Sequence, residues 1–391
     1  MHRRDVFRLL PATALSSSSA DLMGALRITN VRATRLRFPP GRPYADAIHN
    51  FGADRGGVVV QIDTDTGHTG WGYSSFGMVS GGPKVVQTLV EDELKPALIS
   101  QDPVFVKKLR ARMWQATEYH GVTGIAQFAI AACDIAIWDI LGRAAGLPVW
   151  KMLGAFHDRM PVYNMCGWYY ENDADLAQYR KAIESALAEG FTAVKIKVGR
   201  GSLDEDTRRI RLARELLGKD GRIMVDANQA LNRNEAIRRG RLYQDLGCYW
   251  YEEPLQPHDR DGYGELAHAL DIRIATGENE YTKYSFLELL KRGGADVVQP
   301  DNRRAGGPTE WMEIAAIADA FGVELASHGG GPTNLHMLLS MPNAIYMETG
   351  SLKNDTTNVE PLRMVDGAVL PPQTPGMGSE LRKDYIEKYR V

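Results

Sequence analysis

The sequence predicts an α/β protein, a barrel of parallel strands surrounded by helices and preceded by a smaller α+β domain. From residue 161 onward, eight short apolar runs alternate with amphipathic helical segments. No G-x-G-x-x-G turn follows the first run, which disfavours the alternative, an open doubly wound sheet. We therefore expect a (β/α)8-type barrel (β7α) whose last unit is degenerate.

The expected elements of the barrel follow one another through residues 156–361, which we assign to the barrel domain. The expected strands are residues 161–166, 192–198, 222–227, 248–251, 272–276, 296–299, 323–326 and 344–347. The helices expected between them include residues 175–189, 204–217, 234–246, 285–292 and 308–321. Short connections between strand and helix are typical of such a barrel.

Residues 26–155 are predicted to form the α+β domain. Its expected strands are residues 26–38, 57–64 and 71–73. Its expected helices are residues 84–98, 103–119 and 125–141. The last helix is apolar nearly all round and therefore buried, so Asp134 and Asp139 are expected to bond to neighbouring elements. The proline-containing tail, residues 362–391, is expected to pack back on this domain.

Composition restricts the class of partner. The chain has 391 residues, 44% of them hydrophobic and 24% charged, with a formal net charge of −3, as is usual for soluble globular proteins. No basic run is interleaved with aromatics, so we expect no nucleic-acid partner. We also expect no membrane partner, because no apolar run approaches the about 20 residues of a membrane span. Cys133, Cys166 and Cys248 have no metal-ligand spacing and are expected to be buried thiols.

The N-terminus resembles a twin-arginine export signal. Arg3 and Arg4 precede a mildly apolar stretch that Pro11 interrupts, and residues 16–20 are small, as near a cleavage site. The alternative is a disordered extension. Residues 1–25 are excluded from the fold on either interpretation. The first predicts a periplasmic protein and the second a cytoplasmic one.

Two lysines interrupt an apolar strand. Lys195 and Lys197 are two positions apart, so their side chains lie on the same face of the strand. Neighbouring ammonium groups repel each other and lose hydration, and both effects lower a lysine's pKa and let it act as a base near neutral pH. The alternative is an edge strand whose lysines reach solvent. The second position of a closed barrel has no such edge.

Polar residues also stand where the later strands end, and a barrel of this type carries its chemistry at these ends. They are Asp226, Asn228, Glu252, Glu253, Glu278, Asp301, His328 and Glu348. A single acid there is more often a helix N-cap, but Asp226, Glu252 and Glu278 on three consecutive strands would repel one another strongly. A hard divalent cation with oxygen ligands, Mg²⁺, resolves that repulsion. Zinc is disfavoured because the trio contains no cysteine or histidine.

His328 follows the seventh strand. A lone histidine is usually structural, but Asp301, one strand earlier, is placed to accept its ring N–H and raise its basicity. In a closed barrel the lysine pair and this His–Asp pair face each other across a metal-bound substrate. Such an arrangement suits removal of the proton α to a carboxylate, followed by its return or by an elimination.

The ordered motifs resemble the mandelate racemase subgroup of the enolase superfamily from about residue 27 to the end of the chain. The motifs are K-x-K (195–197), D-x-N (226–228), E-E-P (252–254), G-E-N (277–279), Q-P-D (299–301), S-H-G (327–329) and M-E (347–348), with the helical segment 131–139 before them. The resemblance implies the barrel with an N-terminal capping domain, one Mg²⁺ per site and a homo-oligomer. It also implies that the loops 39–50 and 74–82 close the pocket and set its specificity.

The resemblance also assigns roles. Asp226, Glu252 and Glu278 would bind Mg²⁺. Lys197 would be one acid/base group, and Lys195 would lower its pKa and touch the substrate carboxylate. His328, oriented by Asp301, would be the other group, while Glu348 would hydrogen-bond the enediolate oxygen and Asn228 would lie near the carboxylate.

Segments 225–229, 252–255 and 275–278 are similar to those of aldarate and other acid-sugar dehydratases, and Arg304 also fits that group. The polar loop around Asp46 and His49 suits a polyol, unless His49 faces solvent, and we group Trp168 with these substrate-binding residues. Residues 329–331 and the pair Arg303–Arg304 depart from the pattern and affect the far end of the pocket, although Arg303 has the alternative of pairing with a surface acid.

We therefore expect a Mg²⁺-dependent hydro-lyase that converts a sugar acid through a metal-stabilised enediolate to a 2-keto-3-deoxy acid. The alternatives are a racemase, epimerase or cycloisomerase on the same site and, less favoured, a catalytically silent binding protein. The complete acid/base set argues against the silent protein.

Overall fold

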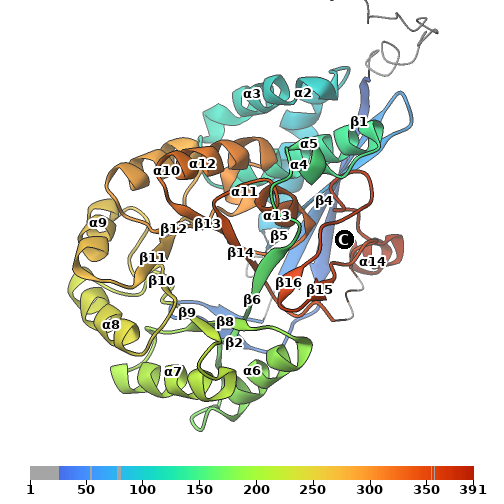
Figure 1. The fold of residues 1–391 in the computed structure, drawn as a ribbon. Coiled ribbons are helices and arrows are strands. Elements are labelled where there is room, and N and C mark those ends of the chain that lie inside the picture. The colour runs from blue at the N-terminus through green and yellow to red at the C-terminus, as the bar shows by residue number, and fades with distance from the viewer. Residues whose placement is uncertain (1–25, 53–54, 77–80, 354, 356) are drawn as a thin grey trace, which may run out of the picture.

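The computed structural model describes residues 26–391 except 53–54, 77–80, 354 and 356. The predicted export signal in residues 1–25 lies outside the described residues, as does the middle of the loop 74–82. Eight parallel strands form the barrel (Figure 1), namely β6 (Met160–Gly167), β8 (Ala193–Lys197), β9 (Arg222–Asp226), β10 (Trp250–Glu252), β11 (Arg273–Thr276), β12 (Val297–Val298), β13 (Glu324–Ser327) and β14 (Ala344–Thr349). β14 pairs with β6, so the sheet closes. The predicted fold class is confirmed.

Helices cover the outside of this barrel (Figure 1). They are α6 (Ala177–Glu189), α7 (Leu203–Leu217), α8 (Arg233–Asp245), α9 (Arg260–Ala269), α10 (Thr282–Lys291), the short α11 (Asn302–Ala305), α12 (Pro308–Ala320) and α13 (Pro332–Leu338). After β14 the next described elements are the short strands β15 (Met364–Val365) and β16 (Ala368–Val369). β16 pairs antiparallel with β6, so this unit departs from the strand–helix pattern, as the sequence predicted.

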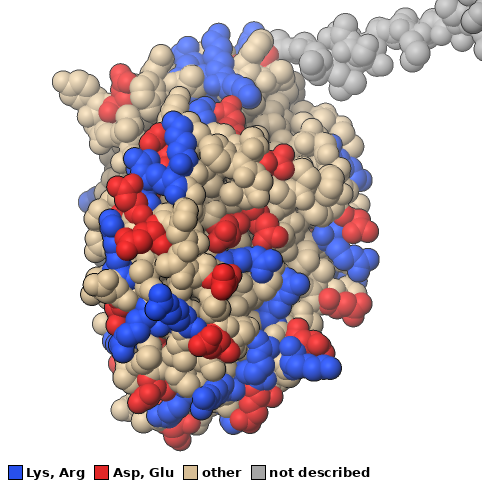
Figure 2. All heavy atoms as spheres, turned by 60° about the vertical axis from the view of Figure 1, so that its left-hand side comes forward, with Lys and Arg blue, Asp and Glu red and all other residues tan. Residues whose placement is uncertain are grey.

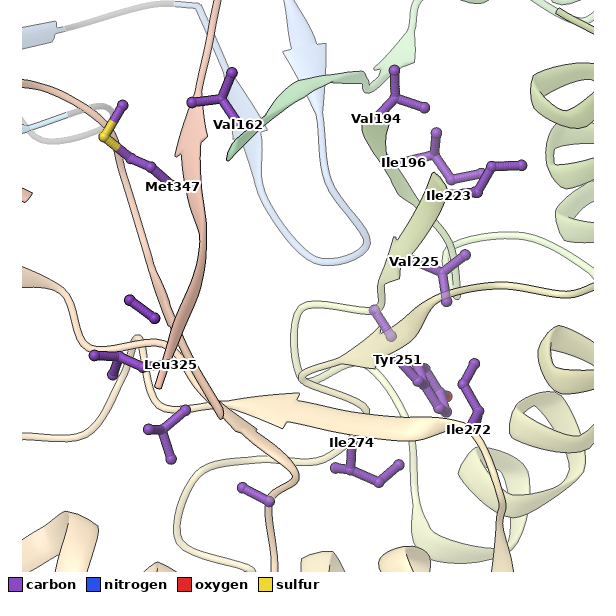
Figure 3. Close-up of a cluster of buried hydrophobic side chains, with 14 of the residues drawn as sticks. Val162, Val194, Ile196, Ile223, Val225, Tyr251, Ile272, Ile274, Leu325 and Met347 are labelled. Carbon is purple, nitrogen blue, oxygen red and sulfur yellow. The ribbon is translucent and has the colours of Figure 1, made fainter. Parts of the chain in front are cut away.

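Strand alternation divides the side chains into a core between sheet and helices and a second set inside the barrel. Val194 and Ile196 of β8 face the helices, together with Ile223 and Val225 of β9 and Ile274 of β11 (Figure 3). Because side chains alternate along a strand, Lys195 and Lys197 point to the inside of the barrel. A second cluster fills the interior with the side chains of Tyr163, Ala193, Met224, Trp250, Ala275, Val297, Ala326 and Tyr346.

The N-terminal domain is an antiparallel sheet with helices on one face. The sheet contains β1 (Ile28–Phe38), β4 (Arg55–Thr64) and β5 (Thr69–Phe76), in that order. The helical elements are α1 (Gly82–Thr88), the π-helix η1 (Leu89–Leu94), α2 (Lys95–Leu98), η2 (Pro103–Phe105), α3 (Val106–Thr117), η3 (Glu118–His120), α4 (Ile125–Ala145) and α5 (Val149–Met152). Gly72 lets β5 approach α4 closely, because a Cβ there would collide with the carbonyl oxygen of Ala132.

Helix α4 corrects one expectation from the sequence. By length and composition it is long and apolar enough to cross a membrane, although we expected no such run. However, 78% of its apolar window is buried inside the protein, so α4 is the central core helix of the capping domain. Its two acids bond to neighbouring elements as expected. Asp139 accepts the backbone N–H of Trp71 at 3.0 Å and of Met377 at 2.7 Å.

The capping domain also contacts the C-terminal tail and the barrel domain. The C-terminal helix α14 (Lys383–Tyr389) packs on β1, with Tyr385 and Tyr389 against Phe38. The predicted loop 39–50 contains β2 (Tyr44–Ala45), which pairs with β3 (Asn50–Phe51) and with β7 (Tyr169–Tyr170) of the barrel domain. This loop is therefore attached to the barrel by a strand pairing.

The surface carries charges of both signs. Figure 2 shows basic and acidic side chains interspersed over the face in view, with no broad patch of one sign. That distribution agrees with the net charge of −3 and gives no electrostatic footprint for nucleic acid on this face.

Candidate active site

The three predicted metal ligands meet at the carboxyl ends of the barrel strands. Asp226 and Glu252 end β9 and β10 and pair directly in the sheet, and Glu278 follows β11 by two residues. One oxygen of each carboxylate lies within 4.8 Å of the others, and all three residues are buried. Among the described residues this is the one such group of acids, histidines or cysteines that could hold an ion. Buried carboxylates this close need a cation.

The donor set of this group fits Mg²⁺, because all of its ligands are carboxylate oxygens. Beside it, the side-chain oxygen of Asn228 is buried without a hydrogen-bond partner, while the Asn228 backbone N–H donates to Asp226 Oδ1 at 2.9 Å. Asn228 therefore has a free polar atom next to the carboxylates, where the sequence placed a substrate-binding group.

Lys195 lies among three carboxylates inside the barrel. Its Nζ is 2.5 Å from Glu252 Oε1 and 3.3 Å from Asp226 Oδ2, and it also pairs with Glu348. The side chain is only 2% exposed. Although burial opposes the charge, these carboxylates hold the pKa of Lys195 well above its ordinary value of 10.5.

Lys197 is nearer the mouth of the barrel. Its Nζ donates to Asp226 Oδ2 at 2.5 Å and lies 4.6 Å from the centre of the Trp168 ring. Burial and Lys195 lower its pKa, but Asp226, with Glu252 and Glu278, raises it further, so the net pKa is above 10.5. The predicted effect of Lys195, to lower the pKa of Lys197, is present, but the nearby acids outweigh it, so the expected net lowering is not found for this set of charges.

His328 and Asp301 form the predicted pair. His328 Nδ1 is 2.7 Å from Asp301 Oδ2, while its Nε2 is 3.5 Å from Glu278 Oε2 and 3.9 Å from Glu348 Oε1. The imidazole is thus anchored at one nitrogen and presents the other to the carboxylates. Burial opposes the charged form, but Glu278 and Asp301 hold the pKa of His328 above 6.5.

Glu348 is held as a carboxylate. It accepts hydrogen bonds from the Gly329 backbone N–H at 2.9 Å and from the Tyr163 hydroxyl at 3.1 Å. Burial favours the neutral acid, but Lys195 and His328 hold the pKa of Glu348 at about 2. An ionised Glu348 accepts hydrogen bonds, so donating one to an enediolate oxygen, as the resemblance implied, requires that it first take up a proton.

The expected substrate-binding residues divide into two groups. Trp168 contacts Lys197, with Tyr44 edge-on at 4.7 Å, and Arg304 donates to the Glu278 carbonyl oxygen at 3.1 Å. Both lie beside the carboxylate trio. The side chain of His49 is 38% exposed and its Nδ1 is 2.9 Å from Asp46 Oδ2.

Asp46 is hydrogen-bonded within its own loop. Its carboxylate is buried and accepts the backbone N–H groups of Ile48 at 2.8 Å and of His49 at 2.6 Å, besides the ring of His49. Its two oxygens are used within its own loop, as is typical of an Asx-type turn. In this structure Asp46 shapes the loop and orients His49 rather than offering a free group to a substrate.

Sequence reasoning missed the residues that support the site. Gln299 Nε2 and Trp250 Nε1 donate to Glu252 Oε2 at 2.8 and 3.0 Å. Of these two residues, only Gln299 could have been found from the sequence, through its place in the Q-P-D motif. Arg209 of α7 donates to the carbonyl oxygens of Lys197 at 3.1 Å and Gly167 at 2.8 Å, with no sequence signal.

Arg303 also differs from expectation. The alternative that it pairs with a surface acid is wrong, because its guanidinium pairs with the fully buried Asp301. Two adjacent arginines, Arg303 and Arg304, therefore both approach the acid that orients His328.

Comparison with known proteins agrees with this geometry. Residues 178–385 match the family Enolase C-terminal domain-like, and residues 30–154 match Mandelate racemase / muconate lactonizing enzyme, N-terminal domain. The chain is 34% identical to the 3,6-anhydro-alpha-L-galactonate cycloisomerase of Streptomyces coelicolor, over 93% of this chain and 99% of that protein. It is 33% identical to the arabinonate dehydratase of Saccharolobus solfataricus, over 85% and 90%.

Solved structures show the same likeness. The L-talarate/galactarate dehydratase of Salmonella typhimurium, liganded with Mg and L-lyxarohydroxamate, superposes with a TM-score of 0.87 at 29% identity, covering 97% of this chain and 96% of that one. Members of the enolase superfamily use Mg²⁺, and relatives of this chain are dehydratases and cycloisomerases of acid sugars. The chain belongs to the mandelate racemase/muconate lactonizing enzyme family of the enolase superfamily, as its motifs predicted.

Proposed function

We propose that this protein is a Mg²⁺-dependent dehydratase that removes water from a sugar acid and gives a 2-keto-3-deoxy acid. The observation that carries the proposal is the placement of two proton-transfer groups around one carboxylate trio. Lys197 contacts Asp226, and His328 Nε2 lies 3.5 Å from Glu278 Oε2. They come from β8 and from the residue after β13, which lie apart in the closed barrel.

The chemistry needs a base for the α-proton and an acid for the leaving oxygen. Mg²⁺, when bound, supplies positive charge that offsets the substrate carboxylate and the negative charge that develops on it. Lys197 or His328, after losing its own proton, takes the α-proton, and the C–O bond at carbon 3 then breaks. His328, whose pKa is raised, protonates the departing hydroxyl, so one water leaves and the enol becomes the 2-keto acid.

The interior lysine has a different part in this proposal. Lys195 is buried among Glu252, Asp226 and Glu348, and only 2% of its side chain is exposed to solvent. It is therefore proposed to hold these acids in place and to lend its charge to the substrate carboxylate. Lys197, with its 7% exposure beside Trp168, is the lysine at the mouth of the barrel that meets the proton.

A second candidate is a cycloisomerase, which the 34% identity to the Streptomyces coelicolor cycloisomerase favours. The same chemistry, loss of the α-proton followed by breaking of the C–O bond at carbon 3, also explains a cycloisomerase reaction. When the oxygen on carbon 3 belongs to an intramolecular ring, breaking its C–O bond opens the ring and no water is lost. The site residues then have the same roles, and the product is an isomer of the substrate.

The test is a panel of aldonic, aldaric and anhydro-sugar acids incubated with the protein and Mg²⁺. Semicarbazide detects the 2-keto product, and mass spectrometry separates loss of water from isomerisation. The dehydratase proposal predicts a keto product lighter than its substrate by one water, while an isomeric keto product would favour the cycloisomerase. If no acid in a broad panel forms a keto product, both candidates are wrong.

The control for this panel is a lysine remote from the site. Lys107 on α3 is 78% exposed and pairs with Glu313 on the surface. Lys107→Met is expected to keep full turnover. Epimerisation without a keto product, seen as α-proton exchange in D₂O, would instead indicate the racemase alternative.

A further inference from the structure

The carboxylate of Asp301 has two arginine partners besides His328, namely Arg304, whose Nη1 is 3.4 Å from Oδ2, and Arg303, which makes the closer contacts. Arg303 donates from Nε to Asp301 Oδ1 at 2.9 Å and to Oδ2 at 3.2 Å, and its Nη2 also donates to Oδ2. Asp301 caps α11, so it accepts the backbone N–H of Arg303 at 2.7 Å and of Arg304 at 3.2 Å as well. The orientation of this buried carboxylate is therefore fixed from two sides.

The same guanidinium reaches the capping domain. Arg303 Nη1 donates to the backbone oxygen of Ser75 at 2.8 Å and to its hydroxyl at 3.0 Å. Ser75 belongs to β5 and pairs with Gly57 of β4 in the capping sheet. A single side chain thus connects that sheet with the acid that orients His328.

Orientation matters at the other end of the imidazole. With Nδ1 on Asp301, His328 Nε2 lies 3.5 Å from Glu278 and 3.9 Å from Glu348. The terminal torsion of an aspartate is broad. Without the Arg303 side chain the backbone N–H groups still hold Oδ1, but Oδ2, which bonds to the imidazole, loses its closest arginine partner and gains freedom to move. Lys197 is held differently. Its Nζ and its carbonyl oxygen bond to Asp226 and Arg209 within the barrel, and it meets the capping domain through the ring of Trp168, on which Tyr44 packs, rather than through hydrogen bonds.

We propose that Arg303 is a positioning residue that makes the orientation of His328 depend on the seating of β5 of the capping domain. The effect on turnover rests on the proposed function, in which His328 transfers a proton. The active site is then assembled unequally. The capping domain reaches the His328 side through directed hydrogen bonds of Arg303, and it reaches the Lys197 side only through ring packing on Trp168.

The experiment uses the full chain and two readouts. The first is the proton NMR signal of the His328 Nδ1–H in its hydrogen bond to Asp301, assigned by its absence in His328→Asn. The second is kcat and KM for the acid that the panel identifies. Arg303→Met is expected to shift or broaden the signal and to lower kcat about 10- to 100-fold, because residues that orient an active group carry effects of that size. KM is expected to change less than about threefold, since Arg303 acts on the proton step.

Two milder variants separate the ends of the connection. Arg303→Lys keeps a cation for Asp301 but loses the fork that also reaches Ser75, so its signal and kcat are expected between those of the wild type and Arg303→Met. Ser75→Ala removes one acceptor at the capping end and leaves every Asp301 contact, so a smaller shift of the His328 signal is expected. These variants keep the proposal testable if Arg303→Met does not fold.

The matched control is Arg110→Met. Arg110 is also buried where the two domains meet, with Gln127 Oε1 at 2.9 Å and Glu310 at 3.9 Å, and no contact with Asp301 is found. Its variant should leave the signal in place. An unchanged signal in Arg303→Met, or an equal change in Arg110→Met, would overturn the proposal. If no sugar acid reacts, the proposed function fails, while the NMR comparison still decides the role of Arg303.

Discussion

Replacing Asp134 by asparagine is expected to stabilise the protein above neutral pH and to change its stability little in acid. Asp134 is fully buried in α4, where its oxygens accept the backbone N–H and the hydroxyl of Thr309 at 2.8 Å each. Burial raises its pKa from 3.8 to about 6, against the effect of these hydrogen bonds. Because the folded state prefers the neutral acid, its contribution to stability is complete below pH 3.8 and is lost as the pH rises through about 6.

The size of the effect follows from the pKa. A rise from 3.8 to about 6 corresponds to about 3 kcal/mol of unfolding free energy that the wild type loses on ionisation. An asparagine at this position keeps an acceptor oxygen for Thr309 and cannot ionise. With an unfolding entropy of about 2.1 cal/mol/K per residue, the advantage of the variant corresponds to about 4 °C in melting temperature.

Differential scanning calorimetry of both proteins between about pH 4 and about pH 8 measures this directly. Groups common to both proteins cancel in the difference between their melting temperatures. We expect that difference to increase in favour of Asp134→Asn as the pH rises through about 6. A difference that does not depend on pH, or one that falls, would refute the argument that Asp134 is buried against its charge.

Three further predictions concern the site. Saturating Mg²⁺, at about 100 times its dissociation constant, should stabilise the wild type by about 2.7 kcal/mol, measured as a rise in melting temperature. Asp226→Asn should lose this rise, and Glu253→Gln, a change next to the trio but outside it, should keep it. Arg209→Met should lower the unfolding free energy by about 3 kcal/mol or more, because it removes the guanidinium that donates to the carbonyl oxygens of Lys197, Gly167 and Trp168. An unchanged melting temperature would contradict this. Asp46→Ala should raise KM more than it lowers kcat, because it releases the loop that carries His49, and kinetics on the identified acid would test this.

The barrel and the positions of its polar residues could be predicted because both follow from periodicity. Lys195 and Lys197 alternate with apolar residues, so a strand must turn them to the same side. Carboxyl ends of parallel strands share one face of a barrel, so Asp226 and Glu252 had to meet. The metal trio therefore followed from spacing alone.

Two of the barrel helices that the sequence did not indicate, α9 and α13, depend on tertiary contacts. α9 contains Gly262 and Gly264, which weaken helix propensity, but Asp259 caps it and Gly264 allows close packing against Arg292. α13 is short and buried throughout, with no polar face to produce a helical period.

Two electrostatic features of the site could not be predicted from the sequence, for one common reason. The sequence shows that Lys195 stands beside Lys197. It does not show that the carboxylate of Asp226 lies against the Lys197 ammonium group and outweighs the repulsion from Lys195. It shows Asp46 in a polar loop, but not that two backbone N–H groups bond to its Oδ1 and the ring of His49 to its Oδ2. Such partners depend on distances between segments, which periodicity does not determine. The oligomeric state and the export signal stay predictions.

The most direct test of the account is the keto product formed in D₂O by the wild type, Lys197→Ala and His328→Asn, each with Mg²⁺. The account predicts a 2-keto-3-deoxy acid with one solvent deuteron at carbon 3 for the wild type, and no product for either variant, although both still show the Mg²⁺ thermal shift. Full turnover in either variant would contradict the assignment of Lys197 and His328 as the two proton-transfer groups.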